Sequence, residues 1–124
     1  MTIDGLIRSG RIRRESVSPT EIRDVLKLAD RDLRVARKLM AVETDWGFTV
    51  AYHAVLQAGR ALMFARGYRP ASAEGHKNTF AFLAAALGPE HAELIGYFDR
   101  MRNKRNQAVY EWPAASPRPK RALC

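Results

Sequence analysis

Residues 18–40, SPTEIRDVLKLADRDLRVARKLM, carry the clearest helix signal in the chain and decide its fold class. Ser18, Pro19 and Glu21 form a capping box, in which side chains satisfy the free backbone N–H groups at the start of a helix. Apolar residues then recur at steps of three and four: Ile22, Val25, Leu26, Ala29, Leu33, Ala36 and Met40. This spacing predicts a long amphipathic helix that buries one stripe.

A second long helix is expected to begin after Asp45 and to run to Arg66, with Gly67 ending it in a left-handed conformation. Apolar residues surround most of this segment. They leave a narrow polar line formed by Thr49, His53, Gln57 and Arg60. A helix with so little polar surface is either central in the fold or buried against a second subunit, and the sequence allows both interpretations.

The same spacing extends through the rest of the chain, and no stretch shows the alternation expected of a strand. We expect a short helix over residues 3–12 that stands outside the core, a third helix over 76–87 and a fourth over 89–111. Residues 67–75, GYRPASAEG, are expected to form a surface loop. Because the connections are short, neighbouring helices should be antiparallel. The predicted fold is all-α: an antiparallel up-and-down four-helix bundle with a short extra N-terminal helix.

This fold divides the chain into an N-terminal helix or arm over residues 1–17, a helical bundle over 18–112 and a tail over 113–124. The length of 124 residues suits one domain and excludes a two-domain enzyme. The end of the chain, from residue 112 onward, contains three of the six prolines and no acidic residue. We therefore expect a disordered basic tail that adds nonspecific attraction to polyanions.

Composition restricts the partners and the setting. The chain has 21 Lys and Arg against 13 Asp and Glu, which gives a net charge of +8 and favours nucleic acid over a membrane as the partner. A basic domain without a polyanion ligand is the alternative. The sequence offers no membrane span and no secretory signal, and the single Cys124 cannot form a disulfide within the chain. These features predict a cytoplasmic protein with no membrane partner.

The fourth predicted helix carries an arginine where its apolar stripe predicts a hydrophobic residue. The stripe reads Leu94, Phe98, Met101, Arg105, Ala108 and Trp112. A guanidinium stays charged and is costly to bury alone, so Arg105 pairs with a carboxylate, extends to the surface, or lines a cleft that binds an anion. A run of charges also fits a solvated helix face, but phosphate contacts would suit the donors around it: Arg102, Asn103, Lys104 and Asn106.

Residues 97–111, YFDRMRNKRNQAVYE, resemble the closing helix of the HEPN family of small all-helical proteins. The family motif is an arginine, often followed by a polar residue, with a histidine a few residues further on. Two upstream stretches also resemble the family: residues 51–62, AYHAVLQAGRAL, and residues 65–70, ARGYRP, which lead into Gly75 and His76. The similarity covers residues 22–111, most of the chain.

The resemblance implies a homodimer in which the two motif helices converge on a shared cleft. Many members resemble metal-independent endoribonucleases that act as toxins beside a minimal nucleotidyltransferase antitoxin, and others bind nucleotides or protein partners. By this resemblance, the expected catalytic residues are Arg105, Asn106 and Tyr110. The expected ligands of RNA or of nucleotide phosphates are Arg102, Lys104 and Arg105, and neither a metal nor a cofactor is expected.

The chain departs from the family motif at Tyr110, which occupies the position of the histidine. Metal-free RNA cleavage needs a base that accepts the 2′-OH proton, and such a base contributes roughly 10²–10⁴ in rate. An unperturbed histidine, with a pKa of about 6.5, suits this role, whereas a tyrosine, with a pKa of about 10, stays protonated. No other register supplies the base, because His91 is the last histidine of the chain. We therefore expect catalysis to be weakened or lost.

The histidines upstream carry weaker signals. His53 lies on the polar line of the second long helix, where it either faces the cleft or is hydrogen-bonded within the bundle. His76 follows the glycine-containing loop and is expected to be a helix-start or loop residue rather than a catalyst. Three histidines and a distant cysteine show no spacing typical of metal ligands.

The sequence therefore predicts a homodimeric, HEPN-type domain that binds RNA or nucleotides, with metal-independent endoribonuclease activity left open. The alternative is a non-enzymatic interaction module that pairs with a minimal nucleotidyltransferase. In that case Arg105 forms a structural ion pair and Tyr110 is a candidate for adenylylation. A DNA-associated helical protein is a third interpretation, disfavoured because no helix-turn-helix pattern stands out.

Overall fold

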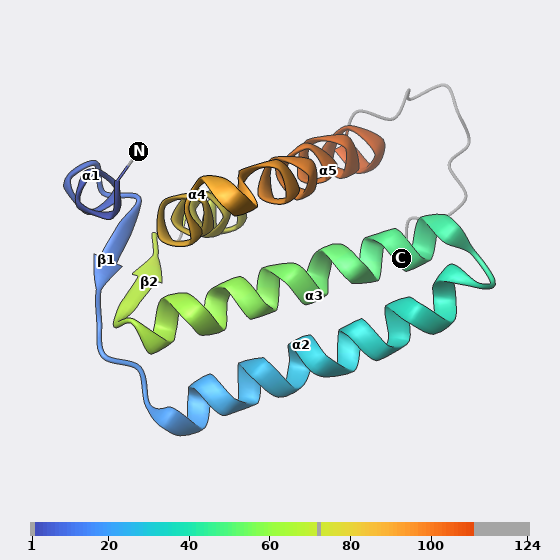
Figure 1. The fold of residues 1–124 in the computed structure, drawn as a ribbon, viewed down its shortest axis with the longest axis horizontal. Helices are drawn as coiled ribbons and strands as arrows, with labels where there is room; N and C mark the ends of the chain where they lie inside the picture. The colour runs from blue at the N-terminus through green and yellow to red at the C-terminus, as the bar shows by residue number, and fades with distance from the viewer. Residues whose placement is uncertain (1, 72, 111–124) are drawn as a thin grey trace.

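The part of the chain that the structure describes is mostly helical, as the sequence predicts (Figure 1). The computed structural model describes residues 2–71 and 73–110, with side chains up to residue 103. The elements follow in the order α1 (Ile3–Arg8), β1 (Ile12–Arg14), α2 (Pro19–Met40), α3 (Thr44–Ala65), β2 (Tyr68–Pro70), α4 (Gly75–Leu87), the 3₁₀ turn η1 (Pro89–His91) and α5 (Ala92–Tyr110).

The start of α2 has the cap that the sequence predicts. Ser18 precedes the helix in an extended conformation, and its hydroxyl accepts a hydrogen bond from the backbone N–H of Glu21 at 3.1 Å. Pro19 occupies the first helical position, where a missing N–H leaves no hydrogen bond unmade. The local sequence therefore determines where α2 begins.

α2 and α3 form a long antiparallel pair joined by a short turn (Figure 1). Alanines bury their small side chains along this pair: Ala29 and Ala36 on α2 and Ala61 on α3. Near the turn, a Cβ added at Gly47 would lie 2.5 Å from Sδ and 2.9 Å from Cα of Met40. The close approach of the two helices at this point therefore requires glycine.

The apolar stripe predicted for α2 is only partly buried, which corrects the expectation from the sequence. Val25 and Ala36 are buried, but the side chains of Leu26, Leu33 and Met40 are 50%, 42% and 40% exposed. The reason is that α2 packs mainly against a single helix, α3, so only a narrow seam of the stripe meets a neighbour. Leu26, Leu33 and Met40, spaced seven residues apart, are called the α2 flank below.

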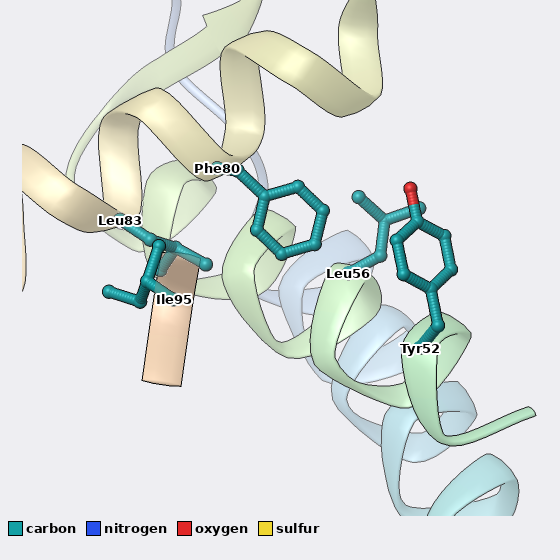
Figure 2. Close-up of a cluster of buried hydrophobic side chains, with 5 residues drawn as sticks. All are labelled: Tyr52, Leu56, Phe80, Leu83 and Ile95. Carbon is teal, nitrogen blue, oxygen red and sulfur yellow. The ribbon is translucent and has the colours of Figure 1, made fainter. Parts of the chain in front are cut away.

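α3 is the central helix, with α2 on one side and α4 and α5 on the other (Figure 1). On the second side it contributes Tyr52 and Leu56 to a buried cluster that also contains Phe80 and Leu83 of α4 and Ile95 of α5 (Figure 2). The rings of Tyr52 and Phe80 lie 5.6 Å apart between centroids. Of the two interpretations of this apolar helix, its central position is therefore confirmed.

β1 and β2 form a two-stranded antiparallel sheet, although the sequence shows no strand pattern. Ile12 of β1 pairs with Pro70 of β2, so part of the segment expected to be a loop is a strand. Gly67, with a φ of 84°, turns the chain after α3 and directs the following residues alongside β1. Strands of three residues are too short to show an alternating pattern, and their pairing joins segments far apart in the sequence.

The N-terminal segment is part of the core. Leu6 of α1 and Ile12 of β1 are buried in one cluster with Met63 of α3 and Phe82 of α4. The expectation of a helix over residues 3–12 standing outside the core is therefore wrong, because α1 ends at Arg8, β1 begins at Ile12, and Leu6 and Ile12 pack against α3 and α4.

Arg69 ties β2 to the start of α2. Its Nη2 donates a hydrogen bond to Oε1 of Glu21 at 2.8 Å. Its Nε lies 2.7 Å from Oε2 of Glu15, an ion pair that lacks the alignment of a hydrogen bond. The hydrogen bond to Glu21 raises the pKa of Arg69 above its usual value. The guanidinium also stacks over the ring of Phe64, 4.8 Å from its centroid.

α4 and α5 begin and end close to the predicted residues, but the first turn of α5 buries a different side chain. Ile95 packs in the cluster with Leu83, whereas Leu94, which the predicted stripe placed inward, is 58% exposed. The cause is that α4 covers the position of Ile95 where the chain leaves η1. Phe98 and Met101 pack against the same cluster and confirm the next two positions of the stripe.

Within residues 2–71 and 73–110, no helix is both long and apolar enough to cross a membrane. The tail predicted over residues 113–124 lies outside the described residues, as does Trp112, the last member of the stripe predicted for α5.

Candidate functional site

Arg102, one of the predicted phosphate ligands, lies on α5 with a side chain that is only 14% exposed. Its Nε donates a hydrogen bond to Oδ1 of Asp99, one turn earlier, at 3.0 Å. Among the described residues this is the one hydrogen bond that its guanidinium makes, and a guanidinium has further N–H donors in a planar fork. Arg102 therefore has donors left for an anion.

The other predicted site residues follow Arg102 on α5. The backbone of Lys104, Arg105, Asn106 and Tyr110 is helical, but their side chains lie outside the described residues. Their assignment to a catalytic site or to phosphate binding stays a prediction from the sequence.

The structure brings Arg102 together with the start of α4, which the sequence did not predict. A pocket of about 280 Å³ is lined by Glu74, Gly75, His76, Lys77 and Arg102. It contains the side chains of an arginine, a lysine and a histidine, contributed by two helices. These residue types, arranged around one cavity, are suited to an anionic group with several oxygens, such as a phosphate.

The rim of the pocket on the α4 side contains a strained residue. Glu74 adopts the left-handed conformation, with φ 57° and ψ 41°, directly before α4. Such a conformation costs a residue with a side chain roughly 1 kcal/mol or more, and strain of this kind often occurs at functional sites. The carboxylate of Glu74 lies 3.8 Å from Nζ of Lys77.

A buried asparagine holds this rim in place. Asn78 is 3% exposed. Its Nδ2 donates to the carbonyl oxygen of Ala73 at 3.1 Å, and its Oδ1 accepts a hydrogen bond from Nε of Arg11 at 2.9 Å. Its backbone N–H donates to the carbonyl oxygen of Glu74. The first turn of α4 is thereby anchored to both the preceding loop and the N-terminal segment.

The ring of His76 contacts Tyr52, a residue of the buried core. Its Nδ1 lies 3.2 Å from the hydroxyl oxygen of Tyr52, a residue that is 1% exposed. Figure 2 shows this hydroxyl at the edge of the buried cluster, away from Leu83 and Ile95. The ring of His53 also packs edge-on against that of Tyr52, with 5.5 Å between the two centroids. The expectation that His76 would be a helix-start residue is confirmed.

The cations of the pocket have carboxylate partners, but these leave room for an anion. Lys77 and Glu74 are about half and two-thirds exposed, and an exposed ion pair contributes about 0–1 kcal/mol, whereas a hydrogen bond to a charged group contributes about 1.5–3 kcal/mol. A bound phosphate can therefore compete with Glu74 for Lys77. Asp99 accepts a hydrogen bond from Nε of Arg102, so a phosphate would use the other N–H groups of this guanidinium.

A larger pocket of about 530 Å³ lies between α1, α4 and the start of α5. Small and apolar residues such as Ala84, Ala85 and Pro89 make up most of its lining, and Asp4 is the one charged residue among its lining residues. Its lining residues include no Lys, Arg or His to offset Asp4, so this pocket does not suit the predicted ligand despite its size.

Across the described part of the chain, no three His, Cys, Asp or Glu side chains are grouped so that they could hold a metal ion. A scan against protein-family models matches none of them, and searches of curated proteins and of solved structures give no match.

Sequence reasoning could not find this pocket, because its cations belong to different helices and each one alone has an ordinary interpretation. The signals present were a histidine and a lysine directly after a glycine, at a predicted helix start, and a donor-rich stretch on the last helix. Their proximity depends on how α4 and α5 pack around Tyr52.

Proposed function

We propose that this chain is a HEPN-type domain that binds RNA or nucleotide phosphates, with the helices α2 to α5 as its bundle. The observation that supports the proposal best is the pocket in which Arg102 meets His76 and Lys77. The donor-rich stretch that carries the family resemblance and an anion-suited cavity thus share a residue. The proposed setting is the cytoplasm, and no metal or cofactor takes part.

Binding at this pocket is tested with the matched pair Arg102→Gln and Arg100→Gln. Both substitutions remove one positive charge from α5, but Arg100 is exposed and does not line the pocket. Losing one charge-assisted contact of about 1.5–3 kcal/mol should weaken binding of a labelled single-stranded RNA roughly tenfold or more for Arg102→Gln. The slope of log affinity against log salt should also fall by about 0.7.

Arg100→Gln should change both quantities less, because it alters only the general charge of the helix. Equal losses of RNA affinity for the two variants, measured by fluorescence anisotropy, would show that RNA binding depends on the net charge of the protein alone. That result would contradict a phosphate site at the pocket.

Endoribonuclease activity in the proposed domain is metal-independent and weakened, because Tyr110 stands where the family motif has histidine. The proposed catalytic residues are Arg105, Asn106 and Tyr110, and Lys104 and Arg105 add phosphate contacts. A mixed RNA pool incubated with the protein and a chelator should be cleaved slowly, and Arg105→Ala should abolish the cleavage. Cleavage that is unchanged by this substitution would rule out the enzymatic form of the proposal.

The proposed domain is a homodimer, and the α2 flank is an exposed surface that supports this. A dimer through this flank would hold the two α5 helices apart, whereas the family resemblance implies that they converge on a shared cleft. A second copy can lie antiparallel on the α2 flank, so that Leu33 meets Leu33 and Leu26 meets Met40. Asp30 and Arg37, which border the flank in the sequence, then fall opposite one another across the two-fold axis. The flank is thus complementary to itself in both apolar and charged positions.

Light scattering on Leu33→Asp and on the control Leu94→Asp tests the dimer. Both leucines are exposed, at 42% and 58%, but Leu94 lies on α5, away from the flank. Leu33→Asp should give a monomer and Leu94→Asp should stay dimeric. A wild-type protein that is monomeric at micromolar concentration would refute the dimer.

The alternative function is a non-enzymatic interaction module that pairs with a minimal nucleotidyltransferase in a toxin–antitoxin system. The exposed apolar residues of the α2 flank also favour this function, because another protein could cover them. A monomeric chain that forms a complex with such an enzyme, and whose RNA affinity does not depend on Arg102, would support it. Intact-mass measurement after co-expression with the nucleotidyltransferase would show whether Tyr110 is adenylylated.

A further inference from the structure

We infer that His76 is the general base for RNA cleavage in this protein and takes the role that Tyr110 cannot fill. The inference rests on the proposed function, since it concerns a reaction of the RNA that the pocket binds. It also goes beyond that proposal, which places the catalytic residues on α5. His76 belongs to α4 and lines the same pocket as Arg102 of α5.

The geometry gives His76 a fixed orientation. Tyr52 is held within the core by Leu56 and Phe80, and its hydroxyl lies 3.2 Å from Nδ1 of His76. When Nδ1–H donates to this hydroxyl oxygen, the neutral ring carries its lone pair on Nε2, the nitrogen opposite. Tyr52 is thus a positioning residue that holds the ring of His76 through Nδ1.

The surroundings of His76 supply the other requirements of the reaction. Lys77 and Arg102 line the same pocket and can donate hydrogen bonds to the non-bridging oxygens of a phosphodiester. The segment that carries His76 is anchored by Asn78 through its bonds to Ala73 and Glu74. The base, the phosphate donors and a rigid support are therefore present around one cavity.

The reaction is an internal transfer at phosphorus. Nε2 of His76 accepts the proton of the ribose 2′-OH, and the 2′-oxygen forms a bond to the adjacent phosphorus. The bond between phosphorus and the 5′-oxygen of the next nucleotide breaks, and this oxygen takes up a proton from water. The products are a 2′,3′-cyclic phosphate and a free 5′-OH, and His76 then returns its proton to the solvent. No oxidant, metal or further reactant is consumed.

The test compares His76→Gln with His91→Gln, a histidine on η1 that is exposed and does not line the pocket. Cleavage of single-stranded RNA is measured with a chelator present, and RNA affinity is measured in parallel. At saturating RNA, His76→Gln should lower the cleavage rate roughly 10²–10⁴-fold, a larger factor than its loss of RNA affinity, because His76 also lines the binding pocket. His91→Gln should cleave at the wild-type rate.

Tyr52→Phe provides an independent variant, because it keeps the ring in the core and removes only the hydroxyl. It should lower the cleavage rate without loss of RNA affinity, and it should move the rising limb of the pH–rate profile, which belongs to the base. Thermal unfolding followed by circular dichroism shows that each variant is folded. A purely structural role of Tyr52 would leave that pH profile in place.

Each remaining outcome has a separate meaning. Undiminished cleavage by both His76→Gln and Tyr52→Phe overturns the inference and leaves the proposed function standing. RNA binding without any cleavage by the wild type also overturns the inference, while the binding function stands. A wild type that neither binds nor cleaves RNA overturns the proposed function and the inference with it.

Discussion

Gly47→Ala tests the close contact of α2 and α3, on which the exposed α2 flank depends. Alanine in place of glycine in a helix normally stabilises by about 1 kcal/mol. At Gly47, however, the new Cβ would lie 2.5 Å from Sδ of Met40 and 2.9 Å from its Cα. The sulfur can move with its flexible side chain, but the Cα cannot, so the helices must separate locally. Such overpacking costs typically about 1–3 kcal/mol.

Gly96→Ala on α5 is the matched control, because its nearest atom would be Nη1 of the flexible Arg100 side chain at 3.4 Å. Both variants gain the same helix propensity, so the difference in their free energies of unfolding isolates the contact at Met40. We expect this difference to be about 1–3 kcal/mol, with Gly47→Ala the less stable variant. Urea unfolding followed by circular dichroism measures it. Equal stabilisation of both variants would refute the close packing of α2 on α3 at this residue.

Three further substitutions test single features of the fold by the same urea measurement. Ser18→Ala should cost about 1 kcal/mol because the cap of α2 is lost, and unchanged stability would mean that water replaces the cap. Glu74→Gly should stabilise by about 1 kcal/mol because glycine adopts the left-handed conformation without strain, and a loss would contradict that strain. Arg69→Gln should cost about 1–2 kcal/mol, since it removes two carboxylate contacts and the stacking on Phe64. High salt should reduce the difference in the free energy of unfolding between this variant and the wild type.

The helices could be predicted from the sequence because their signals are local. A cap such as Ser18 acts within three residues, and Gly67 and Gly88 adopt positive φ angles that end helices wherever the rest of the chain lies. The central position of α3 also followed from composition, because a helix with so little polar surface must be covered on several sides.

The features of the fold that could not be predicted depend on contacts between segments far apart in the sequence. β1 and β2 pair because a cluster shared by α1, α3 and α4 holds two three-residue segments side by side, and neither segment is a strand by its own pattern. The burial of Ile95 in place of Leu94 depends on where α4 lies. The exposure of Leu33 depends on how many helices pack against α2, which its own spacing does not contain.

In the candidate site, too, local signals could be predicted from the sequence and contacts between distant segments could not. Arg102 could be singled out from the donor-rich stretch of the last helix, but its partners His76 and Lys77 could not. Each has an ordinary interpretation at a helix start, and only the packing of α4 and α5 around Tyr52 makes them neighbours. The roles of Arg105, Asn106 and Tyr110 stay predictions, because their side chains are not described.

Net charge alone is a poor guide to this site. The chain carries +8, yet all four arginines of α2 are exposed. Exposed charges attract any polyanion, and salt screens this attraction. Arg102 differs because its side chain is 14% exposed and engages one carboxylate through a single nitrogen. Removing such a guanidinium from water costs free energy that one hydrogen bond to a half-solvated Asp99 only partly offsets. A phosphate in the pocket would satisfy the remaining donors, so partial burial of one arginine supports a specific anion site more strongly than the total charge.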